Sequence, residues 1–262
     1  MPPRVRGVLV DLNGTLHVGD TLLPGVAEAL ERLRARGVPL RFVTNTTKET
    51  TAKCIARVQR LGLDIQEHEV ISSLAAAKRL LISRRLRPLL LVSPEAMADF
   101  ASLECGEPNA VVVGLAPTEF CYSRLNQAFR LLLANEAAPL IAIQRALYLR
   151  EADGLSLGPG PFVTALESAT GRTAETVGKP EAAFFQLAVD DLGCRPEDCI
   201  MIGDDVRDDV GGAQAAGLRG VLVRTGKYRP GDETKHEDIQ PEQTVENFAA
   251  AVDFVLGEWH AV

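Results

Sequence analysis

Several polar residues follow apolar runs, directly or within one helical turn, where their side chains could take part in a reaction. They are Asp11, Thr44-Asn45, Lys179, Gly203–Asp205 and Asp208-Asp209. Two carboxylates and a backbone carbonyl can hold an octahedral Mg²⁺, which prefers oxygen ligands. A metal ion and a lysine would neutralise the phosphoryl oxygens that otherwise repel an attacking carboxylate. The set therefore favours phosphoryl transfer.

In such a site each residue has a distinct task. Asp11 could attack phosphorus and form an aspartyl-phosphate that water hydrolyses, while Asp204 supplies the second metal carboxylate. Lys179, Thr44 and the backbone N–H of Asn45 would bind the phosphoryl oxygens. Each feature alone also has a structural interpretation, as a turn cap, a surface lysine or an acidic helix start. Their shared position after predicted strands favours a reaction site.

The surrounding residues predict a parallel α/β core. Val8–Val10 is an apolar run typical of a strand buried on both faces, and Gly14 ends the strand pattern shortly after Asp11. Residues with helical periodicity alternate with further short apolar strands, at Leu40–Val43, Val70-Ile71, Cys199–Ile202 and Gly220–Val223. The carboxyl ends of parallel strands share one edge of a sheet, so the polar residues after them can converge.

A second series of strands and helices interrupts this core. It includes a predicted hairpin over Tyr148–Leu155 with an Asp-Gly turn and a helix ending at Gly171. The strand Thr173–Val177 is then predicted to resume the core. We predict a core formed by residues 1–83 and 174–262 and a smaller inserted α/β domain over residues 84–173. Polar residues Arg229–Gln243 predict a surface loop.

Bulk properties exclude several classes of protein. The 262 residues include 28 Lys+Arg and 35 Asp+Glu, a net charge of −7 without long runs of one sign. This balance disfavours nucleic acid or an anionic membrane as partner. No apolar stretch reaches the roughly 18 residues of a membrane span, and no signal-peptide pattern is present. The five cysteines form no CxxC pair. We expect a cytoplasmic protein with a small phosphorylated substrate.

The motifs resemble those of the haloacid dehalogenase superfamily of phosphohydrolases over nearly the whole chain. Four motifs carry the resemblance: Asp11–Thr15, Thr44, Lys179 and Gly203–Asp209. The insert lies between the second and third motifs, as do the type 2 caps of that family. The resemblance therefore implies a Rossmann-like core with a cap domain, and it implies a homodimer formed through the cap.

The resemblance also implies roles for individual residues. Asp11 would be the nucleophile and a Mg²⁺ ligand, joined by the backbone carbonyl of Asn13 and the carboxylate of Asp204. Asp205 and Asp209 would support these ligands without contacting the metal. The catalytic residues would be Asp11, Asn13, Thr44 and Lys179, and the substrate would contact Asp11, Leu12, Asn13, Thr44, Asn45 and Lys179.

Asn13 departs from the first motif of the family, which places a second aspartate there as general acid and base. An amide cannot carry the proton, so a contribution of about 10²–10⁴-fold in rate is missing or moved. The protein could be a slow phosphatase, or it could use leaving groups that need little protonation, such as phosphoramidates or pyrophosphate. Alternatively, it could bind phosphorylated ligands without turnover. We favour the second account, because the metal and phosphate groups are otherwise present.

Two further features leave alternatives open. His17 is the histidine nearest to the first motif and could replace the missing base, but a loop imidazole is the simpler interpretation. In the insert, Arg145 with Arg150 and Glu151 with Asp153 could face the site as specificity groups. A solvated hairpin is again the simpler interpretation.

Overall fold

The computed structural model describes residues 5–151 and 153–259. Predictions that include residues 1–4, 152 or 260–262 lie outside the described residues at those positions. The larger sheet has six parallel strands in the order β14-β13-β12-β1-β4-β5. Its strands are β1 (Gly7–Asp11), β4 (Leu40–Thr44), β5 (Val70–Ser72), β12 (Cys199–Gly203), β13 (Arg219–Val223) and β14 (Gln243–Val245).

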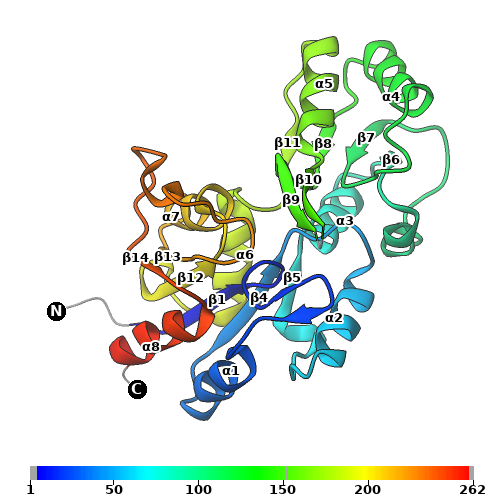
Figure 1. Ribbon diagram of the computed structural model, residues 1–262. Coiled ribbons are helices and arrows are strands. Elements are labelled where there is room, and N and C mark those ends of the chain that lie inside the picture. Colours follow the sequence, from blue (N-terminus) through cyan, green and yellow to red (C-terminus); the bar gives the residue numbers. More distant parts are fainter. Residues whose placement is uncertain (1–4, 152, 260–262) are drawn as a thin grey trace.

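Helices cover both faces of this sheet (Figure 1). Val8 and Val10 of β1 pack towards α1 and α8, whereas Leu9 packs towards α6 and α7. The central strand is therefore buried on both faces, as its continuous apolar run predicts. The helical segments of this domain are α1 (Val26–Ala35), α2 (Thr51–Arg60), η1 (Glu67–Glu69), α6 (Ala182–Leu192), η3 (Pro196–Asp198), η4 (Val206–Gly211), α7 (Gly212–Ala215), η5 (Asp232–Thr234) and α8 (Phe248–Glu258).

The smaller domain contains a four-stranded parallel sheet in the order β11-β8-β7-β6. Helices α4 and α5 pack on one face of this sheet, and α3 and η2 pack on the other. The predicted α/β core with an inserted cap is confirmed. The elements are α3 (Ser73–Ser83), β6 (Pro88–Leu91), η2 (Pro94–Phe100), β7 (Ala110–Val113), α4 (Tyr122–Ala134), β8 (Leu140–Ala142), α5 (Gly160–Thr170) and β11 (Glu175–Thr176).

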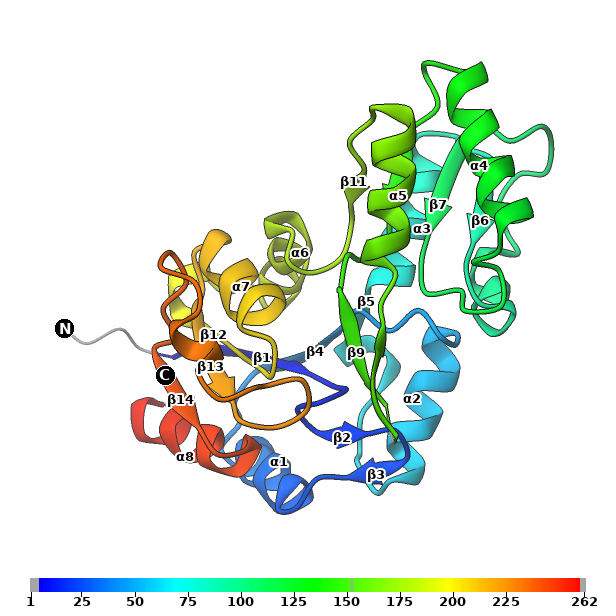
Figure 2. The ribbon, with the colours of Figure 1, turned by 45° about the horizontal axis from the view of Figure 1, so that its top comes forward.

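An antiparallel hairpin, β9 (Tyr148–Glu151) and β10 (Gly154–Leu157), leaves the cap and descends towards the core. In Figure 2 it points towards α2 and the small hairpin formed by β2 (His17–Val18) and β3 (Thr21–Leu22). The cap thus places a two-stranded arm over the carboxyl edge of the core sheet.

The segment that follows α5 joins a different sheet from the predicted one. The strand expected at Thr173–Val177 does not return to the core sheet, so that prediction is wrong: β11 pairs with β8 of the cap. A two-residue strand carries too little pattern to show which sheet it joins. Helix α3 also packs against the cap sheet, through Leu74, Ala77 and Leu81. We propose that the cap extends over residues 73–177 instead of 84–173.

Short elements lie between the predicted ones. The segment after the first motif forms the β2–β3 hairpin, and the predicted loop Arg229–Gln243 contains η5 and ends where β14 begins. After Asp205 the chain continues as the π-helical segment η4. Within the described residues, every helix falls short of the length and apolar character needed to cross a membrane.

Candidate functional site

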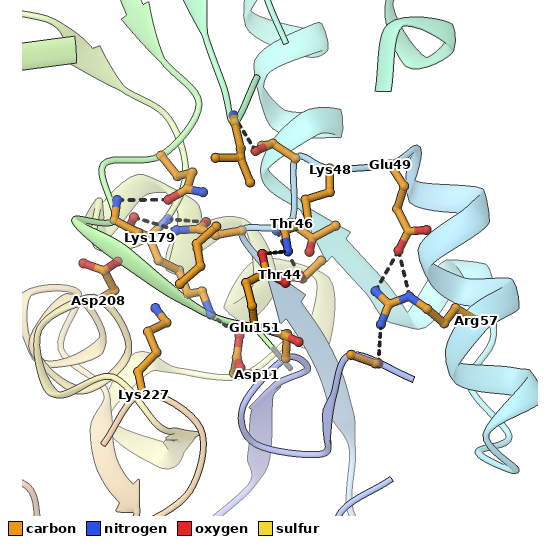
Figure 3. Close-up of a pocket in the computed structure, with 18 of the residues that line it drawn as sticks. Asp11, Thr44, Thr46, Lys48, Glu49, Arg57, Glu151, Lys179, Asp208 and Lys227 are labelled. Carbon is orange, nitrogen blue, oxygen red and sulfur yellow. Dashed lines mark hydrogen bonds and ion pairs between the residues drawn. The ribbon is translucent and has the colours of Figure 1, made fainter. Parts of the chain in front are cut away.

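The carboxyl ends of the core strands meet below the cap hairpin and form a cavity of about 360 Å³. Asp11 ends β1, Thr44 ends β4, and Asp204 follows β12 directly. In Figure 3, Lys179 and Lys227 approach Asp11 from one side, and Arg57 and Glu49 lie on the other. The predicted residues among those that line the cavity are Asp11, Asn13, Thr44, Asn45, Lys179, Asp208 and Asp209.

A buried lysine joins two of the carboxylates at the cavity floor. Lys179 Nζ lies 2.5 Å from Asp11 Oδ1 and 2.7 Å from Asp209 Oδ1, and its side chain is 3% exposed. Burial opposes a charge on Lys179, but the two carboxylates raise the pKa of its ammonium above the ordinary value. The lysine is therefore a permanent cation beside the candidate nucleophile.

The side chain of Asn45 holds Lys179 in place by bonding the backbone of the lysine. The side-chain amide of Asn45 donates to Lys179 O at 2.9 Å and accepts from Lys179 N at 3.0 Å. Gly178 permits this approach, because a Cβ there would collide with Asn45 Oδ1. The Asn45 side chain thus positions Lys179. Thr44 Oγ1 accepts from Thr46 N at 3.1 Å, and its side chain is buried at the cavity wall.

Three buried carboxylates form a candidate metal centre. One oxygen each from Asp11, Asp204 and Asp209 lies within 4.8 Å of the others. Burial raises the pKa of Asp204 well above its ordinary value, although the charge of Lys227 lowers it. Burial also raises the pKa of Asp209 to about 7, although the charge of Lys179 lowers it. Lys179 is paired with Asp11 and Asp209 at once, so two buried carboxylates share one ammonium and Asp204 lies close to both. Such an excess of buried carboxylates fits a divalent cation, which favours oxygen ligands. Asp209 therefore lies within the candidate ligand cluster.

Close backbone approach makes this cluster compact. Gly14 has a φ of +106°, and a Cβ on it would collide with the Asp204 carboxylate. A Cβ on Gly203 would collide with the carboxylate of Asp209. The glycines of the first and fourth motifs thus leave the space that the carboxylates occupy.

The remaining residues of the first motif have different positions. Asn13 lines the cavity and is half-buried, whereas the Leu12 side chain packs in the apolar core. A contact between Leu12 and substrate could therefore involve only its backbone. The Asn13 backbone ligand and the Leu12 contact stay predictions.

His17 is not the loop imidazole that the sequence suggested. It lies in β2 with its side chain fully buried, and Nδ1 is 2.9 Å from Gly19 O. Burial and the nearby Arg57 guanidinium lower the pKa of His17, and it is not among the described residues that line the cavity. Its position therefore does not support a role as replacement base.

Lys227 is a site residue that the sequence interpretation missed. Its Nζ lies 2.9 Å from Asp205 Oδ2, and its backbone N–H donates to Asp204 Oδ2 at 2.7 Å. Burial opposes its charge, but Asp205 and Asp204 raise the pKa of Lys227 well above the ordinary value. A sequence signal was present, because Gly226-Lys227 follows a predicted strand as Gly178-Lys179 does.

Asp205 caps the start of η4, and Asp208 lies in its first turn. Asp205 accepts from the backbone N–H groups of Arg207 and Asp208 at 3.0 and 2.9 Å. Although burial opposes the shift, Lys227 and the Asp208 N–H lower the pKa of Asp205. Asp208 accepts from Arg207 Nε at 3.0 Å, while its buried Oδ2 has no partner among the described residues. Asp208, to which the sequence assigned no separate role, lines the cavity beside Asp209.

The cap contributes one of the residues that the sequence left open. Glu151 of β9 forms an ion pair with Lys48 of the core and lines the cavity, so the solvated-hairpin interpretation is wrong for Glu151. Arg145 instead pairs with Glu167 within the cap, at 2.6 and 2.7 Å. The side chain of Arg150 lies outside the described residues.

Comparison with known proteins agrees with this geometry. A HAD-hydrolase-like family model matches residues 176–251, and a haloacid dehalogenase-like hydrolase model matches residues 8–105. The chain is 56% identical over 252 residues to haloacid dehalogenase-like hydrolase domain-containing protein 2 of Bos taurus, covering 96% of each chain. It is 41% identical over 256 residues to human phospholysine phosphohistidine inorganic pyrophosphate phosphatase, covering 96% of this chain and 94% of that protein.

Solved structures share the whole fold. A 4-nitrophenylphosphatase from Thermotoga maritima superposes with a TM-score of 0.87 at 26% identity, covering 96% of this chain and 97% of that one. A glycerol phosphate phosphatase from Mycobacterium tuberculosis, in complex with calcium, gives 0.80 at 28% identity and covers 94% and 74%. With these relatives and residues of all four motifs around one cavity, the chain belongs to the haloacid dehalogenase-like hydrolase family, as its sequence predicted.

Proposed function

We propose that this enzyme is a Mg²⁺-dependent phosphatase that cleaves a small phosphorylated substrate through an aspartyl-phosphate on Asp11. The observation that carries the proposal is the arrangement at the cavity floor. The Asp11 carboxylate opens into the cavity, bonded to Lys179 and clustered with Asp204 and Asp209. Phosphatase names among the relatives support the same class of reaction.

In the first step an Asp11 oxygen bonds to phosphorus while the bond from phosphorus to the leaving group breaks, and the leaving group keeps the electron pair. Lys179 Nζ balances the charge of the phosphoryl oxygens, helped by the Thr44 hydroxyl. A divalent cation held by Asp11, Asp204 and Asp209 would neutralise the same oxygens when bound. These carboxylates are already close together, so little reorganisation of the chain is needed.

In the second step the oxygen of water bonds to phosphorus and the bond from Asp11 to phosphorus breaks. Asp11 regains its carboxylate, and the released phosphate carries away the protons of the water. Asn13 cannot accept the water proton or protonate the leaving group. We therefore expect substrates whose leaving atom needs no proton from the enzyme, such as a phosphoramidate or pyrophosphate. The name of the human relative at 41% identity mentions both phosphoramidates (phospholysine and phosphohistidine) and pyrophosphate.

A panel of substrates tests this proposal. Phosphate release would be measured with Mg²⁺ and with a chelator for pyrophosphate, a phosphoramidate, 4-nitrophenyl phosphate and an alkyl phosphate. We expect metal-dependent release that falls as the leaving group becomes more basic. The Asp11→Asn variant should be inactive, and beryllium fluoride with Mg²⁺ should form an adduct on Asp11 in the unchanged protein.

The outcomes separate this proposal from a catalytically weakened phosphate-binding protein. Binding of phosphate and of the beryllium fluoride adduct without turnover of any substrate would favour the binding role. Turnover that survives in Asp11→Asn would contradict the aspartyl-phosphate route. Full activity in the presence of the chelator would contradict the metal requirement.

A further inference from the structure

A second hollow adjoins the phosphate cavity on the cap side. It has a volume of about 850 Å³ and lies between the hairpin, η2 and the start of α5. The two cavities share five lining residues, Lys48, Glu95, Leu115, Leu149 and Glu151. A ligand whose phosphate reaches Asp11 could therefore extend past the Lys48–Glu151 pair into the second hollow, which we call the cap groove.

The walls of the cap groove are largely apolar. Phe120 and Phe162 stack with ring centroids 3.8 Å apart and planes 13° from parallel, and both line the groove. Leu157 on β10 also lines it, with 66% of its surface exposed. An apolar ligand body would cover these side chains, and the gain from removing them from water would favour binding.

Carboxylates dominate the charge of the cap groove. Glu95, Glu151 and Asp153 line it, and Lys48 is the one cation among its described lining residues. Lys48 is already paired with Glu151, whereas Glu95 and Asp153 form no ion pair within the described part of the chain. The groove thus repels a second anionic group and attracts a cationic one.

We propose that the cap groove selects the part of the substrate beyond the phosphate: an apolar, ring-sized body that ends in a cationic or uncharged group. This inference rests on the proposed function, because the phosphate at Asp11 anchors the ligand. The core then recognises the phosphate, and the cap groove discriminates against substrates whose body carries an anionic group into the groove. Bisphosphates and carboxylated sugar phosphates would belong to this disfavoured class. Pyrophosphate has no such body, so this selection does not act on it.

Non-hydrolysable phosphonates test the inference without requiring turnover. Calorimetry on the full chain with Mg²⁺ would compare methylphosphonate with benzylphosphonates bearing a 4-methyl, 4-aminomethyl or 4-carboxy group. We expect the 4-methyl ring to bind about tenfold more tightly than methylphosphonate, because it buries apolar surface. We expect the 4-aminomethyl compound to bind about tenfold more tightly than the 4-carboxy compound, because of the groove carboxylates.

Variants of the groove wall assign these effects to the proposed residues. Phe162→Ala and, separately, Leu157→Ala should weaken the three benzylphosphonates several-fold and leave methylphosphonate unchanged. Because Leu157 is largely exposed, its variant keeps the test valid if Phe162→Ala fails to fold. Leu133→Ala is the matched control, since Leu133 is an exposed leucine of the cap outside the groove.

Charge variants test the selection of the ligand end. The double variant Glu95→Gln with Asp153→Asn should reduce the preference for the aminomethyl over the carboxy compound to about twofold or less. Its control is Glu136→Gln, at an exposed glutamate of the cap that does not line the groove.

Two results would overturn the inference while leaving the proposed function intact. One is equal affinity for methylphosphonate and the benzylphosphonates, which would show that the ring does not bind in the cap groove. The other is equal affinity for the aminomethyl and carboxy compounds. If neither methylphosphonate nor inorganic phosphate binds, the phosphate site itself is wrong and the inference falls with it.

Discussion

The floor of the cavity and its roof, which we define by Lys48 and Glu151 at the cap hairpin, each contain a lysine paired with carboxylate, but the two lysines differ in burial. At the floor, Lys179 is 3% exposed and bonds Asp11 and Asp209, which are 8% and 2% exposed. At the roof, Lys48 and Glu151 are 44% and 34% exposed. A buried charge without its partner is costly, whereas an exposed pair contributes little and separates readily. The floor can therefore hold a fixed reaction geometry, and the roof can exchange partners with a substrate.

The largest effect is expected from removing the buried cation of the floor. Lys179→Met would leave Asp11 and Asp209 without compensation, so we expect a loss of about 3 kcal/mol in the free energy of unfolding. The lost phosphate contact should lower kcat/KM by about 10³-fold. Urea unfolding and phosphate release measure the two effects. A stable, active variant would show that the floor does not depend on this cation.

A gain in rate tests whether Asn13 limits the chemistry at the same floor. Asn13→Asp restores a proton carrier beside the nucleophile, and we expect kcat on an aryl phosphate to rise by about 10²-fold. The gain should be smaller for a leaving group that needs no proton. Steady-state kinetics on an aryl phosphate and on a phosphoramidate measure the difference. Equal rates before and after the substitution would show that another step is limiting.

Lys227 provides an intermediate case, because its ammonium contacts Asp205 whereas its backbone holds Asp204. Lys227→Met removes the charge and keeps the backbone N–H. We expect kcat/KM to fall by about tenfold, less than for Lys179, because Asp11 keeps its own lysine. Parallel kinetics of the two lysine variants would show the order. A larger loss of kcat/KM for Lys227→Met than for Lys179→Met would contradict the greater catalytic role that we assign to Lys179.

The smallest effect on stability is expected at the roof. Lys48→Met should change the free energy of unfolding by less than about 1 kcal/mol, because the pair with Glu151 is exposed. We expect the substitution to change KM instead, for substrates that carry a charged group beyond the phosphate. Urea unfolding beside KM for a charged and an uncharged substrate measures both. A loss as large as that of Lys179→Met would remove the distinction between floor and roof.

Much of the site was predictable because it rests on short local patterns. An apolar run followed by Asp11, or by Gly203-Asp204, places a carboxylate at the end of a buried strand wherever the chain folds as a parallel sheet. Because β1 and β12 are neighbours, the two carboxylates meet. Lys227 was harder to find, since its importance arises from burial among other charges, which no local pattern encodes.

The boundary of the cap was less predictable for a related reason. The strand after Gly171 has two residues, and its pairing with β8 depends on the packing of the whole cap. The role of Asn45 was also hidden, because its amide bonds the backbone of a residue 134 positions away. Contacts between distant segments are decided when the sheets pack, after the local patterns have formed.

By itself, the amino-acid sequence determined the alternation of strands and helices, the four motifs and the family, because each depends on residues close together in the chain. Only the tertiary structure decided which charges are buried together, how Asn45 and Lys227 hold the site, and that Glu151 and the cap groove lie beside it. The physical reason is that burial and electrostatic compensation depend on neighbours brought together by folding.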